Sequence, residues 1–90
     1  MDQEVAETAT STFQKKVIVG IIKQLREKII ANGIGKQDMA ELWRRMGYFQ
    51  RRLGDNTAAI VAYGRALKID PKNITAAKAL KSLQGVNLSL

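Results

Sequence analysis

The sequence contains no cysteine and no histidine in 90 residues, and these two absences exclude several classes of protein. Without cysteine there can be no disulfide framework and no thiolate metal site. Without histidine the chain lacks both the commonest general base and the commonest metal ligand. No pair of polar groups stands at a catalytic spacing either. We therefore expect a protein that is not an enzyme and that has no metal site and no cofactor.

Long hydrophobic runs and chain breakers are also scarce. The longest apolar run, residues 17–22, lies between Lys16 and Lys23 and is far shorter than the ~18 residues that a membrane span needs. The polar, acidic start of the chain lacks the basic and apolar regions of a signal peptide. Pro71 is the single proline, which suits a few long helices. These features predict an all-α, cytoplasmic protein that is not integral to a membrane.

Positive charge, in contrast, is abundant. The chain has 15 Lys and Arg residues against 8 Asp and Glu, which gives a net charge of +7 and a pI near 10.1. Asp2, Glu4 and Glu7 fall within the first ten residues, which carry no base, so the rest of the chain is more basic still. A body this basic favours acidic partners, but charge alone does not distinguish an acidic protein from a nucleic acid or a membrane surface.

The first predicted helix spans residues 12–32 and has a wide apolar face. The threonines and the serine at positions 8, 10, 11 and 12 favour caps and turns, so we expect the helix to start at Ser11 or Thr12. The residues before it, 1–11, are predicted to form a flexible acidic tail. Asn32-Gly33 ends it, because glycine tolerates the left-handed conformation that closes a helix. Seven apolar residues share about half of the helical circumference. They are Phe13, Val17, Ile18, Ile21, Ile22, Leu25 and Ile29.

Three further helices are predicted, each with its own start or stop signal. Asp38 and Glu41 have the spacing of a capping box, so the second helix is expected to begin there. Asp55 caps a third helix that ends before Pro71, and Asn73 caps the fourth. The predicted organisation is one helical domain at 12–85, made of an extra helix at 12–32, a hairpin at 37–73 and a final helix at 74–85, with a tail at 86–90.

The hairpin carries a spaced set of residues that is typical of one family. In chain order they are Trp43, Met46, Gly47, Gln50, Ala59, Tyr63 and Pro71. Residues 40–73 thereby resemble a tetratricopeptide repeat, a helix–turn–helix unit of about 34 residues with the pattern W-x2-L-G-x2-Y, A-x3-F and P. Met46 in place of leucine and Tyr63 in place of phenylalanine are conservative departures, whereas Gln50 in place of tyrosine is a sharper one.

The resemblance implies an all-α fold in which the repeat pair is flanked by an N-terminal amphipathic helix and a C-terminal capping helix. The final helix has Leu80 in the position of Met46 but Ala77 in the position of Trp43, which is similar to the solvating helix that ends such arrays. Because about three repeats are usual for stability, we predict that the single repeat is covered further by formation of a homodimer. The predicted self-association residues are Val17, Ile18, Ile21, Ile22, Leu25 and Ile29.

The resemblance also implies a binding surface, because the first helix of each repeat in this family lines a concave groove. The residues placed there are Glu41, Arg44, Tyr48, Arg51, Arg52 and, from the final helix, Lys78. Arginine forks bind carboxylates, and tyrosine adds a flat amphipathic surface. We therefore predict a protein-interaction module, acting as an adaptor, assembly factor or small regulator, that docks an acidic peptide or helix of a partner protein.

Three alternatives stay open at the level of sequence. The high pI and the Arg/Tyr face suit charge-driven binding of nucleic acid, although no known reading helix or aromatic platform is visible. Residues 13–31 suit docking on a membrane surface, although Lys28 interrupts their apolar arc. The arginines are equally consistent with a merely solvated face. The acidic tail also has the charge needed to fold back over the basic groove.

Overall fold

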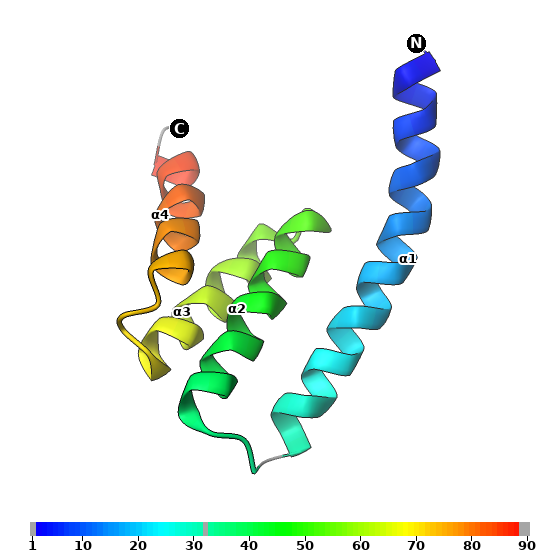
Figure 1. The fold of residues 1–90 in the computed structure, drawn as a ribbon. Coiled ribbons are helices and arrows are strands. Elements are labelled where there is room, and N and C mark those ends of the chain that lie inside the picture. The colour runs from blue at the N-terminus through cyan, green and yellow to red at the C-terminus, as the bar shows by residue number, and fades with distance from the viewer. Residues whose placement is uncertain (1, 32, 89–90) are drawn as a thin grey trace.

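The computed structural model describes the backbone of residues 2–31 and 33–88, and the side chains of residues 12–31 and 33–85. This part of the chain contains four helices: α1 (Asp2–Ala31), α2 (Lys36–Arg52), α3 (Asn56–Ile69) and α4 (Ile74–Leu88). Each helix packs mainly on the next one along the chain, α1 on α2, α2 on α3 and α3 on α4 (Figure 1). The predicted all-α fold with a flanked helix pair is therefore confirmed.

α1 is a single helix of 30 residues that begins at Asp2, so the predicted start at Ser11 or Thr12 is wrong. Alanine and glutamate, which are strong helix formers, occupy four of positions 4–9, and a helix already formed downstream is extended easily through them. The predicted flexibility of residues 1–11 lies outside what the structure describes. In Figure 1 the N-terminal half of α1 extends past the ends of α2 and α3. At the other terminus, α4 also continues beyond its predicted end at residue 85.

The start of α2 differs from the predicted capping box. The helix begins at Lys36, and its N-cap residue is Gly35, which makes no side-chain capping bond. Asp38 lies within the first turn, where a carboxylate is favoured by the helix dipole, and Glu41 pairs with Arg44 instead of reaching back to the helix start. The reason is the short connection after α1. It turns at Gly33, whose φ of +88° suits glycine, and leads directly into the helix.

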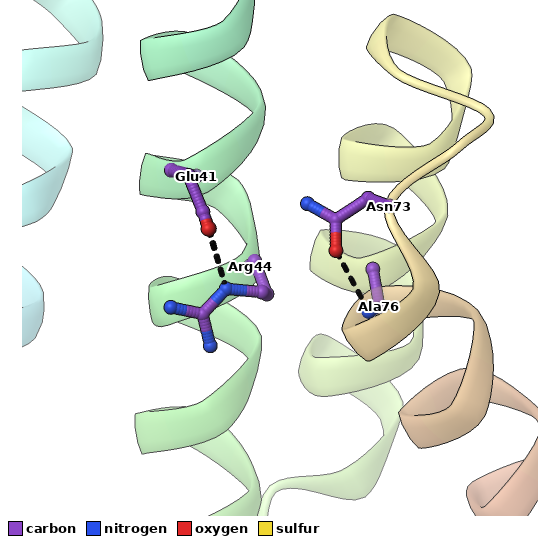
Figure 2. A network of polar contacts seen from close by, with 4 residues as sticks. All are labelled: Glu41, Arg44, Asn73 and Ala76. Carbon is purple, nitrogen blue, oxygen red and sulfur yellow. Dashed lines mark hydrogen bonds and ion pairs between the residues drawn. The ribbon is translucent and has the colours of Figure 1, made fainter.

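The other two helix starts have the predicted caps. The Asp55 Oδ1 atom accepts a hydrogen bond of 3.2 Å from the backbone N–H of Ala58 at the start of α3. At the start of α4, Asn73 Oδ1 accepts one of 3.0 Å from the N–H of Ala76 (Figure 2). Each cap satisfies a backbone donor that the helix itself leaves unpaired. The two turns therefore fix where α3 and α4 begin.

The buried side chains form two neighbouring clusters. The first joins Ile18, Ile22 and Leu25 of α1 to Leu42, Met46 and Ala62. The second joins Ala59, Tyr63 and Ala66 of α3 to Ala76 and Leu83 of α4. Trp43 is partly buried and packs against both clusters. Ala59 and Ala66 of α3, both 0% exposed, together with Gly47 allow the helix pair to approach closely, as the repeat pattern predicts.

The face of α1 that was predicted to mediate self-association lies largely inside the chain. Ile18, Ile22 and Leu25 are buried, while Ile21 and Ile29 are partly buried against the same cluster. Of the six predicted residues only Val17 is exposed, with 47% of its surface accessible. A dimer formed through this face would therefore require α1 to be exchanged between two copies.

Candidate functional site

The candidate site is centred on the basic face of α2, which we define as Arg44, Arg45, Arg51 and Arg52 together with Tyr48. Arg44 is anchored by Glu41, one turn earlier on the same helix (Figure 2). Its Nε atom lies 2.8 and 2.7 Å from the two carboxylate oxygens, and its side chain is 24% exposed. The pair holds the Arg44 guanidinium in a fixed position at the edge of the face.

Tyr48 stands at the centre of the basic face and is 43% exposed. Its ring meets the ring of Phe49 edge to face, with the ring centres 5.0 Å apart. The Arg52 guanidinium lies over the Tyr48 ring at 5.8 Å, and its Nη1 atom donates a hydrogen bond of 3.2 Å to the Tyr48 hydroxyl. The arrangement combines a cation with an open aromatic surface.

Arg51 extends the basic face towards α4. The Arg51 Nη2 atom donates a hydrogen bond of 3.3 Å to Ser82 Oγ on α4. Lys78, which is also on α4, is exposed. Beneath this edge, burial raises the pKa of Tyr63, and the positive charges of Arg51 and Arg44 partly oppose that shift.

A groove between α1 and α2 continues the basic face on its other side. The groove has a volume of about 470 Å³ and is lined by Ile21, Gln24, Leu25, Lys28, Arg44, Arg45, Tyr48 and Phe49. Its floor is apolar and aromatic, and three cationic side chains surround it. We call it the α1–α2 groove.

The structure places the predicted residues in different surroundings. Arg44 and Tyr48 line the α1–α2 groove, whereas Arg51 connects α2 to α4 and Lys78 stands exposed on α4. Lys28 and Arg45 were not among the predicted residues. The one sequence signal for Lys28 was its place inside the apolar arc of α1, and the structure leaves it exposed at the groove.

The available chemistry is that of charged and aromatic recognition. Guanidinium groups can hold carboxylates through paired hydrogen bonds, and the aromatic floor can cover apolar side chains between them. Within residues 12–31 and 33–85, no cluster of acidic side chains could hold a metal ion. No helix in the described part of the chain contains a stretch long and apolar enough to cross a membrane.

A close helix pair followed by a third helix in the same register defines a helical repeat module. Residues 40–83, which include most of α2, all of α3 and most of α4, match the model of the tetratricopeptide repeat family. Residues 40–83 are therefore assigned to that family. Repeats of this kind generally bind other proteins through the surfaces that their helices present, and they are typically not catalytic. No match was found among curated proteins or among solved structures.

Proposed function

We propose that this chain is a protein-interaction module that docks an acidic peptide or helix of a partner protein on the basic face of α2. A role as an adaptor, assembly factor or small regulator fits such a module, and so does a location in the cytoplasm. The partner segment would lie across Tyr48, with its carboxylates beside the arginines and its apolar side chains in the α1–α2 groove.

The observation that carries the proposal is the unbalanced charge of this face. Among the described side chains, the pair between Arg44 and Glu41 is the one ion pair, so the other three arginines have no carboxylate beside them. Arg45, Arg51 and Arg52 are all exposed. A partner carboxylate that displaces water from these forks would gain charge-assisted hydrogen bonds at sites already held in place by the helix.

The alternative of membrane-surface docking loses its main support in the fold. Much of the apolar face of α1 that would enter the lipid is covered by α2, with Ile18, Ile22 and Leu25 buried. Nucleic-acid binding rests on the same positive charge as the proposal and is one outcome of the experiment below.

The test is a pull-down from the native source at moderate salt after nuclease treatment, with three baits. They are the wild type, the variant Arg45→Glu/Arg51→Glu/Arg52→Glu, and the control Lys16→Glu/Lys68→Glu/Lys72→Glu. All six substituted side chains are exposed, and both variants change the net charge equally. Arg44 is left in place so that its pair with Glu41 is kept. Circular dichroism checks that both variants remain helical.

A protein retained by the wild type and by the lysine control, but not by the arginine variant, is the expected result. Equal retention by all three baits would place the binding surface elsewhere and overturn the proposal. If neither variant retained the protein, the interaction would depend on the net charge of the bait and not on the basic face. Recovery of nucleic acid, and of no protein, when the nuclease is omitted would instead identify the basic face as a phosphate-binding surface.

A further inference from the structure

The N-terminal segment of the chain is acidic, whereas the α1–α2 groove is basic. Residues 1–14 contain Asp2, Glu4 and Glu7 and no lysine or arginine. The groove presents Lys28 of α1 and Arg45 of α2, together with Arg44. An acidic helix and a basic groove of complementary charge are therefore present in the same molecule.

The segment cannot occupy the groove of its own chain. α1 is continuous from Asp2 to Ala31, and a helix rises 1.5 Å per residue. Glu7 is therefore held about 30 Å away from Lys28 along the helix axis. Folding back, which the sequence left open for the acidic tail, would require α1 to break. In an assembly of this chain alone, it is the segment of a second copy that can reach the groove.

An exposed seam along α1 gives a second copy a surface to follow. Phe13, Val17, Gly20 and Gln24 recur at intervals of three and four residues, which places them on one helical face. Phe13 is 68% exposed and Val17 is 47% exposed. Gly20 is also exposed, and a Cβ added there would have no atom within 4 Å. Gln24, at the end of the seam, already lines the α1–α2 groove.

We propose that two copies of this chain pair through antiparallel α1 helices, each placing its acidic N-terminal segment in the α1–α2 groove of the other. A pairing that sets Phe13 over Gly20 of the second copy also sets residues 4–7 opposite its residues 26–29. Val17 then lies close to Val17 of the second copy. The arrangement is two-fold and closed, so it ends at a dimer and does not grow into a fibre. It rests on the proposed function to the extent that the same groove binds acidic helices, and here it names one such helix.

The first test is a charge exchange in the full-length chain, measured by sedimentation equilibrium at several salt concentrations. The segment variant is Asp2→Lys/Glu4→Lys/Glu7→Lys, and the groove variant is Lys28→Glu/Arg45→Glu. Each variant alone should raise the dissociation constant of the dimer by more than about tenfold, because like charges then face each other. General repulsion cannot explain both losses, since the first variant raises the net charge and the second lowers it. An equimolar mixture of the two variants should recover a species of about 20 kDa, twice the chain mass of 10.0 kDa.

The second test uses the absence of cysteine from the chain. Under mild oxidation Val17→Cys should give a disulfide-linked dimer much faster than the control Val61→Cys. Val61 is exposed to a similar degree, 49% against 47%, but lies on α3. Equal rates for the two variants would overturn the inference.

Two other outcomes would also overturn it. One is a wild-type mass that stays at 10.0 kDa up to high micromolar concentration. The other is a dimer that persists in both charge variants, which would indicate exchange of α1 between copies. Neither outcome affects the pull-down of a partner protein. Retained capture by a monomeric wild type would therefore reject the dimer and leave the proposed function intact.

Discussion

Gly47 on α2 lies directly against the aromatic ring of Tyr63 on α3. A Cβ atom added to Gly47 would be 3.0 Å from three atoms of that ring, which is tighter than most real Cβ contacts. Tyr63 is 3% exposed and is packed within the second cluster, so a shift of its ring would disturb its neighbours there. The glycine of the repeat pattern is therefore needed here for space, at a backbone position where any residue could be helical.

Gly47→Ala should accordingly destabilise the protein. Alanine is the better helix former by about 1 kcal/mol, but overpacking of a close contact costs about 1–3 kcal/mol, so we expect a net loss of about 1 kcal/mol. Urea unfolding followed by circular dichroism measures it. A variant more stable than the wild type would show that the Tyr63 ring yields freely.

Gly64→Ala is the matched substitution with the opposite expected sign. Gly64 lies inside α3, and a Cβ added there would meet no atom within 4 Å. Only the gain in helix propensity remains, so the free energy of unfolding should rise by about 0.5–1 kcal/mol. The same urea titration applies. A loss of stability would point to an unrecognised role of the glycine.

Removal of the Asn73 side chain should weaken the start of α4. Asn73→Ala deletes the acceptor for the Ala76 N–H, and loss of such a cap costs about 1 kcal/mol. Asn56→Ala is the control, because Asn56 is exposed in the first turn of α3, where Asp55 and not Asn56 provides the cap. It should change stability by less than about 0.5 kcal/mol. Similar losses of stability in both variants would mean that the loss does not come from the capping hydrogen bond.

Stability at high pH should depend on Tyr63. Burial raises the pKa of Tyr63 above the ordinary value, so the native state keeps the phenol proton longer than the unfolded chain does. The stabilisation is present below the unfolded pKa of ~10 and is lost as the pH rises through ~10 towards the native pKa. Tyr63→Phe keeps the ring and removes the ionisation.

The difference in unfolding free energy between the wild type and Tyr63→Phe, measured from neutral to alkaline pH, isolates this effect from lysine titration. We expect the wild type to lose stability relative to the variant above pH ~10. Parallel curves for the two proteins across that range would contradict the prediction.

Gln50 offers a stabilising substitution. It occupies the place where the repeat pattern has tyrosine, and its Oε1 atom is buried without a hydrogen-bond partner among the described residues. An unsatisfied buried acceptor costs about 1–3 kcal/mol, so Gln50→Leu should raise the midpoint of urea unfolding. A lower midpoint would imply that the amide is paired in solution.

The parts of the fold that could be read from the sequence are those set by local chemistry. Asp55 and Asn73 cap their helices because the capping bond spans only three residues. Trp43, Gly47, Ala59 and Tyr63 place the helix pair because their spacing encodes a close crossing. Each of these signals is independent of where the rest of the chain lies.

The features of the fold and of the site that could not be predicted from the sequence depend on how α1 packs on α2. Its wide apolar face gave no indication of which residues α2 would cover, so Ile18, Ile22 and Leu25 were predicted to mediate self-association although they are buried within the chain. The α1–α2 groove depends on the same placement. Lys28 and Arg45 lie on different helices, and nothing in their sequence spacing brings them to one groove.

Because α1 is long, a small change of its tilt on α2 gives a large displacement of its N-terminal end. At 1.5 Å per residue its 30 residues span about 45 Å, and among its described side chains those that are buried lie at and beyond Ile18. For a straight helix of this length, a tilt of about 10° at these contacts moves the far end by about 5 Å. The direction in which the acidic end points is therefore set by the shape of a few side chains buried far from it.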